Sequence, residues 1–118
     1  MKDFVIYNKV KWLIDYTDVY IINSYSKVHI SIKIKLQDNL YNLLENLIRS
    51  VVNKGNIRNK YINEMLVNII LLDYYIGISY DKKIIKKNRF NSFINCLNEI
   101  RKMVLSWCNN EKSKMCIW

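Results

Sequence analysis

The segment from Phe90 to Trp107 carries a regular spacing of large apolar residues, three or four positions apart. The apolar positions are Phe90, Phe93, Leu97, Ile100, Val104 and Trp107. This spacing keeps one face of a helix against a partner, and the polar residues between suit water. The pattern predicts an amphipathic helix over residues 88–110, with Asn88 as its N-cap.

A second helix is predicted over residues 3–22, and a third over residues 57–79. The first of these has an apolar face made of Ile6, Val10, Leu13, Tyr16 and Tyr20, widened by Trp12 and Val19. The apolar face of the other is Ile62, Met65, Leu66, Ile69, Leu72 and Ile76. Both faces follow the helical period, so each helix is expected to bury one side.

The segment from Val28 to Leu36 has an ambiguous pattern. Its apolar residues alternate with polar ones, which is typical of a half-buried strand. Directly afterwards, helical spacing runs through Leu36, Leu40, Leu43, Leu47 and Val51. No turn residue separates the two stretches, and a lone strand would have no partner. We therefore expect one long helix over residues 26–53.

Turn-forming residues are scarce in this chain. It has no proline and only two glycines, Gly55 and Gly77, which argues against sandwiches and barrels. Gly55 is expected to close the helix over 26–53, and Asn56 to cap the next one. Four amphipathic helices with short connections predict an all-α, up-down-up-down antiparallel four-helix bundle, forming a single domain over residues 1–118.

The charge of the chain is strongly positive. A net charge of +9 favours RNA, DNA or an acidic protein as a partner. The chain also lacks alanine and is rich in Asn, Ile, Lys and Tyr, whose codons are AT-rich. Drift in a low-GC genome is therefore an alternative source of part of the lysine excess.

The bundle topology gathers most cations at its two ends. One end receives Lys27, Lys82, Lys83, Lys86, Lys87 and Arg89, whereas the other receives Lys2, Lys54, Arg58, Lys60, Lys112 and Lys114. The run from Lys82 to Arg89 is the best candidate for contact with nucleic-acid phosphates, and Tyr80 and Phe90 beside it offer rings for base stacking. Arg101 and Lys102, on the flank of the last helix, are candidates for a subunit contact.

Catalytic and metal-binding patterns were not found. The single histidine, His29, has no convincing catalytic partner, and Cys96, Cys108 and Cys116 form no metal-ligand pair. No enzymatic activity, cofactor or metal is expected. The longest apolar run, Met65 to Ile78, is shorter than a membrane span, and the first residues lack a signal-peptide layout. A cytoplasmic protein is expected.

One nine-residue segment resembles a known family signature. The segment Glu99-Ile100-Arg101-Lys102-Met103-Val104-Leu105-Ser106-Trp107 is similar to the Glu-Ile-Gly-Arg-Met-Leu-Gly-Gly-Trp that closes accessory variability determinant (Avd) proteins of diversity-generating retroelements. The layout of four helices also resembles that family, including Trp12-Leu13-Ile14 and Arg58-Asn59-Lys60. Leu105 and Ser106 replace small residues of the family pattern, and Arg101 replaces its first glycine.

The resemblance implies a non-catalytic function. Such proteins form positively charged homo-oligomers, typically pentamers, that bind the element's reverse transcriptase and template RNA and support mutagenic cDNA synthesis. The cations at the bundle ends would then meet RNA or the polymerase. The related four-helix proteins of rRNA intervening sequences are the alternative. On that alternative, the chain would be a structural or interaction bundle with no polymerase partner.

Overall fold

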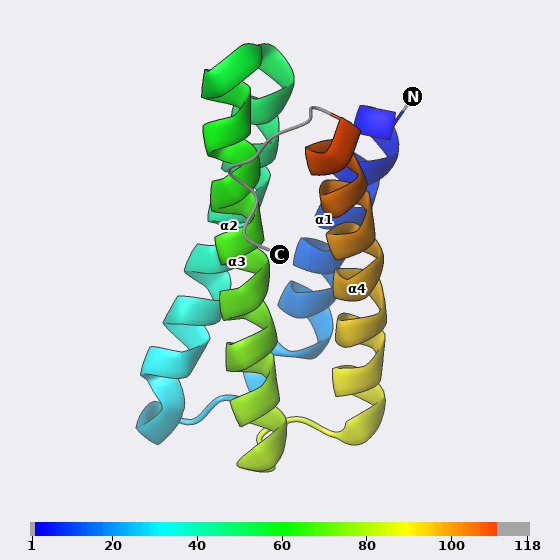
Figure 1. Ribbon diagram of the computed structural model, residues 1–118. Coiled ribbons are helices and arrows are strands. Elements are labelled where there is room, and N and C mark those ends of the chain that lie inside the picture. Colours follow the sequence, from blue (N-terminus) through cyan, green and yellow to red (C-terminus); the bar gives the residue numbers. More distant parts are fainter. Residues whose placement is uncertain (1, 111–118) are drawn as a thin grey trace.

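The computed structural model describes residues 2–110, which form an antiparallel bundle of four helices (Figure 1). The helices are α1 (Lys2–Tyr20), α2 (Ile30–Val52), α3 (Gly55–Asp81) and α4 (Lys87–Asn110). Two short 3₁₀ turns, η1 (Ile22–Ser24) and η2 (Lys27–His29), connect α1 to α2. The described residues contain no strand, so the predicted all-α four-helix bundle is confirmed.

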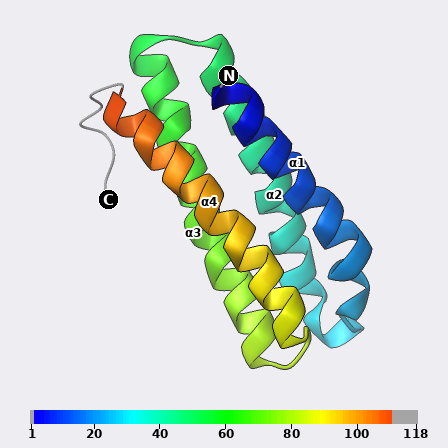
Figure 2. The same ribbon diagram turned by 90° about the vertical axis from the view of Figure 1, so that its right-hand side faces the viewer.

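The connections alternate between the two ends of the bundle. The α1–α2 and α3–α4 connections share one end, and the α2–α3 connection lies at the other end near the N-terminus (Figure 1). Figure 2, turned by 90°, shows the four helices running along one long axis. The molecule measures 43 × 24 × 21 Å, so its two ends are well separated surfaces.

The apolar stripe of α4 forms much of the core, as its spacing predicts. The side chains of Phe93, Leu97, Ile100 and Val104 are fully buried, and Trp107 is nearly so. Phe90, one turn earlier, is half-buried and packs against the same core. Helical periodicity therefore identified the inward face of α4 correctly.

The inward face of α1 differs from the predicted one. Ile6, Val10 and Leu13 are buried as expected, but Ile14, Thr17 and Ile21 complete the buried face. Tyr20, which was expected on this face, and Trp12 and Val19, which were expected to widen it, are exposed. The buried Thr17 hydroxyl donates to the Leu13 carbonyl oxygen, which satisfies its hydrogen bond within the helix. The spacing of apolar residues therefore placed Tyr20 on the inward face, whereas the polar residue Thr17 occupies a core position.

The ambiguous segment is helical. After the 3₁₀ turn η2, α2 runs without a break from Ile30, so the prediction of a helix over 26–53 is confirmed apart from its first turn. Alternate residues lie about 200° apart around a helix, so a strand-like alternation spreads over several faces. Accordingly Leu36 is buried, whereas Ile34 is half exposed and Val28 is 84% exposed.

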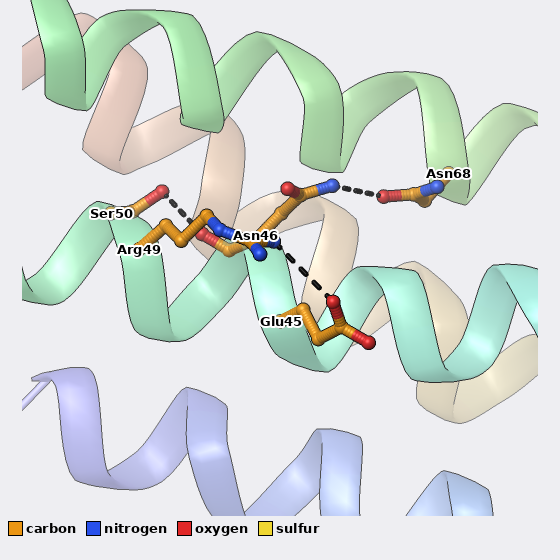
Figure 3. A network of polar contacts seen from close by, with 5 residues as sticks. All are labelled: Glu45, Asn46, Arg49, Ser50 and Asn68. Carbon is orange, nitrogen blue, oxygen red and sulfur yellow. Dashed lines mark hydrogen bonds and ion pairs between the residues drawn. The ribbon is translucent and has the colours of Figure 1, made fainter.

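The contact between α2 and α3 contains a row of asparagines. The Asn46 side-chain amide donates to Asn68 Oδ1 at 2.9 Å, and the Asn68 amide donates to Asn39 Oδ1 at 3.2 Å. On α2, the Ser50 hydroxyl donates to the Asn46 carbonyl oxygen (Figure 3). These bonds satisfy polar groups inside the interface, and their fixed partners define the register of α2 against α3.

At the α2–α3 and α3–α4 connections, the helix ends differ from the sequence prediction. Gly55 has a φ of +63°, as glycine permits, but it begins α3 instead of closing α2. Lys54, not Asn56, is the N-cap of α3, and no side chain caps that helix. Similarly α4 begins at Lys87, so Asn88 lies inside the helix and is not its N-cap.

By length and composition alone, α3 is long and apolar enough to cross a membrane. From the sequence, its apolar run from Met65 to Ile78 was expected to be too short to do so. Its inward residues, including Leu66, Ile69 and Leu72, are buried in the bundle. A core helix of a bundle passes the same test of composition, so the pattern follows from this packing.

Candidate nucleic-acid interface

Four lysines lie at the short connection between α3 and α4, three on the connection itself and the fourth, Lys87, at the first residue of α4. The helix α3 ends in a Schellman motif, in which the Lys83 amide donates to the Tyr80 carbonyl oxygen and the Ile84 amide to the Ser79 carbonyl oxygen. Lys83 takes the left-handed position of this motif, with a φ of 61°. The tight turn leaves Lys82, Lys83, Lys86 and Lys87 exposed, and we call these four residues the lysine cluster.

A shallow pocket lies within this connection. It has a volume of about 550 Å³ and is lined by Tyr80, Asp81, Lys83, Ile85, Lys86 and Lys87. Three of the four lysines therefore border one concave surface. Ile85 anchors the connection because its side chain is buried in the core. The cluster is thus held on a fixed backbone and not on a long loop.

The aromatic residues beside the lysine cluster pack within the bundle. The rings of Tyr80 and Phe90 are stacked, with their centroids 4.7 Å apart, and both residues are half-buried. The Arg89 guanidinium lies 4.5 Å from the centroid of the Tyr20 ring, so it joins α4 to α1. The contact between Tyr80 and Phe90 therefore covers one face of each ring that was a candidate for base stacking, and the Arg89 guanidinium contacts Tyr20.

At the opposite end of the bundle, too, lysines are exposed and an arginine contacts an aromatic ring. Lys54 and Lys60 are exposed there. The Arg58 guanidinium lies 4.6 Å from the Trp107 ring centroid, which joins the beginning of α3 to the end of α4. Lys112 and Lys114, also predicted at this end, lie outside the described residues.

Arg101 and Lys102 have different environments although they are neighbours. Arg101 donates to Asp73 Oδ2 at 2.8 Å and to Asn98 Oδ1 at 3.3 Å, so it links α4 to α3. Lys102 is exposed. Arg101 therefore contributes to bundle packing, whereas Lys102 is available on the surface.

The eleven candidate cations differ by residue type in their exposure, although the exposed Lys60 also lies 5.4 Å from the centroid of the Tyr61 ring. All three arginines contact another side chain of the bundle, as the contacts above show. All the lysines among them are exposed: Lys27, Lys54, Lys60, Lys82, Lys83, Lys86, Lys87 and Lys102. Planar guanidinium groups suit stacking and bidentate pairing, whereas a lysine ammonium stays hydrated. The lysines are thus the part of the candidate site that can reach a polyanion.

In the described part of the chain, two side chains have a clearly altered pKa, and burial is the main cause of both changes. Burial raises the pKa of the Tyr25 hydroxyl, which shares a 2.7 Å hydrogen bond with Ser79. Burial also raises the pKa of the Cys96 thiol to about 11. A thiol of this kind is mostly protonated at neutral pH and is a poor nucleophile.

No group of three potential metal ligands occurs among the residues that the structure describes. His29 is half-buried in the turn before α2.

Sequence reasoning missed the apolar surface of the bundle. Two rows of apolar side chains are exposed on α1 and α2, each with a spacing of seven residues. The exposed residues of these rows are Val5, Trp12 and Val19 on α1, and Ile34, Tyr41 and Ile48 on α2. The spacing of seven was visible in the sequence, but only the structure shows that these rows point outward.

Comparisons with models of protein families, with curated proteins and with solved structures found no match to this chain.

Proposed function

We propose that this protein is a non-catalytic, self-assembling RNA-binding bundle, which acts as an Avd-like accessory subunit of a reverse transcriptase. The observation that carries the RNA-binding part is the lysine cluster. Four exposed ammonium groups lie within six residues, at a connection anchored in the core. Such a cluster can neutralise several phosphates without reading the base sequence.

The charge balance of the surface supports a polyanionic partner. The three ion pairs found among the described residues use Lys9, Arg49 and Arg101, and none uses a member of the lysine cluster. The exposed acid nearest the cluster in sequence is Asp81. Four lysines against one aspartate leave a local excess of positive charge, which attracts an anionic strand over about 8–10 Å at physiological salt.

The segment that resembles the Avd signature contributes mainly to packing. Ile100, Val104 and Trp107 are buried, Glu99 pairs with Lys9 at 3.0 Å, and Arg101 pairs with Asp73. The resemblance supports the accessory role, and the lysine cluster supports contact with RNA. These are independent observations, and they can be tested separately.

The RNA-binding part is tested by replacing Lys82, Lys83, Lys86 and Lys87 together with Gln. RNA affinity is measured at several salt concentrations for the variant and for the unmodified protein. We expect weaker binding and a salt dependence whose slope falls by up to about 3, since each phosphate contact contributes about 0.7 for a single strand. The four side chains are exposed, so the circular dichroism spectrum should not change.

A control variant with the same loss of charge separates the cluster from the net charge. It replaces Lys11, Lys33, Lys35 and Arg49 with Gln, and these residues lie on α1 and α2 outside the candidate site. The control should keep most of the salt dependence. Equal losses in both variants would mean that binding follows the overall charge, and an unchanged cluster variant would exclude this end of the bundle.

The accessory role is tested by co-purification with the reverse transcriptase of a diversity-generating retroelement. An Avd-like subunit should retain the polymerase in the presence of ribonuclease, because the contact is between proteins. RNA binding without polymerase retention would favour the rRNA intervening-sequence alternative instead.

A further inference from the structure

The outer face of α2 presents an apolar row to solvent. Ile34, Tyr41 and Ile48 are each 45–48% exposed, and Ile30 and Val52 extend the row by one turn at either end. Asn39 and Asn46 reach α3, and Tyr41 and Ile48 follow them by two positions. Two positions correspond to about 200° around a helix, so this row lies on the side of α2 away from α3. We call it the α2 face.

A second apolar row lies on α1. Val5, Trp12 and Val19 are each at least 42% exposed. Val5 and Trp12 also line a groove between α1 and α4, together with Lys9, Cys96 and Glu99, which is about 530 Å³ in volume. We call this row and its groove the α1 face. It borders α4, whereas the α2 face lies on a different helix, so the two are separate surfaces of one molecule.

The two faces match in spacing and length. Each has three large apolar residues seven positions apart, which is the period that lets two helices pack along a shared seam. Fourteen residues of helix extend about 21 Å, so the rows are equally long. Trp12 and Tyr41 occupy the middle of their rows, where aromatic residues contribute most to interfaces.

The size of the α2 face suits a protein contact. Its five apolar residues present on the order of 500 Å², comparable with the largest patches on typical monomers. A polar rim around them brings the area close to the roughly 800 Å² that each partner buries in a stable interface. The rim carries exposed charges of both signs, Lys35, Asp38, Glu45 and Arg49, which is typical of the polar rim of a protein interface.

The charges allow a second copy to be the occupant. A chain with a net charge of +9 repels its copies, unless their contact lies away from the lysine-rich ends. On the rim of the α2 face, the exposed acids Asp38 and Glu45 are balanced by the exposed cations Lys35 and Arg49, and Glu45 pairs with Arg49 at 3.4 Å. Beside the α1 face, Lys9 pairs with Glu99 at 3.0 Å, and Lys11 and Asp15 are opposite exposed charges one turn apart. Both rims are therefore close to neutral, so bringing the two faces together adds little charge repulsion.

We infer that the α2 face of one copy docks on the α1 face of the next copy. This inference rests on the self-assembly included in the proposed function, and it adds the surfaces that would build the assembly. Because the two faces differ, the contact is head-to-tail, and repeating it generates a closed ring or an open filament. The lysine cluster of each copy then stays outside the contact.

Three variants with equal added charge test the contact. The α2-face variant carries Ile34→Glu and Ile48→Glu, and the α1-face variant carries Val5→Glu and Trp12→Glu. The control carries Val67→Glu and Ile70→Glu, which are also exposed but lie on α3. Light scattering measures the mass of each at micromolar concentration, and circular dichroism checks that all remain helical. The two face variants should be monomers of 14.3 kDa, whereas the control should assemble like the unmodified protein.

Mixing the two face variants gives the sharpest test. Each keeps one intact face, so the mixture should form a heterodimer with twice the mass of one chain and grow no further. Self-association of the α1-face variant alone would overturn the head-to-tail contact in favour of a symmetric one. An unmodified protein that is monomeric, or a control that also becomes monomeric, would overturn the inference.

The outcome is separable from that of the proposed function. If the protein assembles through other surfaces and still binds RNA, only the docking inference fails. If the heterodimer forms but RNA binding shows no dependence on the lysine cluster, only the RNA-binding proposal fails.

Discussion

At the scale of single residues, the polar residues that are fully part of the core each have a hydrogen-bond partner, and these residues are Thr17, Asn39, Ser50, Asn68 and Ser79. Thr17 and Ser50 donate to backbone carbonyl oxygens one turn earlier, and Asn68 bonds two asparagines of α2. Burying such groups without partners would cost about 1–3 kcal/mol each. The core therefore tolerates these residues because helical and interhelical geometry satisfies them.

Cys96 gives a prediction about pH. Burial raises the pKa of its thiol to about 11, so the unfolded chain loses this proton at lower pH than the folded protein does. Below the unfolded pKa both states are protonated and the free energy of unfolding is unaffected. As pH rises from about 9 to 11, the unfolded state gains stability, and the free energy of unfolding should fall by no more than about 2–3 kcal/mol through this group.

The measurement compares urea unfolding of the unmodified protein and of Cys96→Ala at several pH values. All other groups are the same in the two proteins, so the difference between them isolates the contribution of the thiol. The difference in unfolding free energy should shrink toward pH 11. A constant difference would show that the thiol ionises equally in both states.

At the scale of elements, helix ends are decided by backbone conformation more than by capping side chains. The Schellman motif at the end of α3 places Lys83 at a φ of 61°, where any residue with a Cβ is strained. Glycine would remove that strain. We therefore expect Lys83→Gly to raise the free energy of unfolding by about 0.5–1 kcal/mol, which thermal or urea unfolding can measure.

Lys82 provides a matched control for this prediction. It precedes Lys83 and has a φ of −82°, so glycine gains nothing there and adds flexibility to the unfolded chain. Lys82→Gly should lower the free energy of unfolding, although it removes the same charge. A Lys83→Gly protein that is no more stable than Lys82→Gly would contradict the strain at this turn.

At the scale of the whole molecule, the positive charge lies mainly at the ends of an elongated bundle, and the apolar faces lie along its sides. This arrangement lets one molecule use its sides for assembly and its ends for RNA. Several lysine clusters in one assembly would act together, because binding of one raises the effective concentration of the others.

This arrangement predicts a dependence on RNA length. The α2-face variant should bind a long RNA at least about tenfold more weakly than the assembled protein does, although its lysine cluster is intact. A short RNA that reaches only one subunit should bind both proteins equally, and this serves as the control. Filter binding or fluorescence anisotropy measures both affinities, and equal affinities for the long RNA would argue against joint action of the subunits.

The sequence by itself determined the number and type of helices, the inward face of α4 and the location of the cations, because these follow from local periodicity and chain connectivity. The tertiary structure alone decided which cations are exposed to solvent and which contact other side chains. Arg58, Arg89 and Arg101 contact rings or carboxylates brought near by other helices, and no local pattern encodes such neighbours. It also decided that Trp12 and Tyr41 point outward, because burial depends on how four helices are rotated against one another.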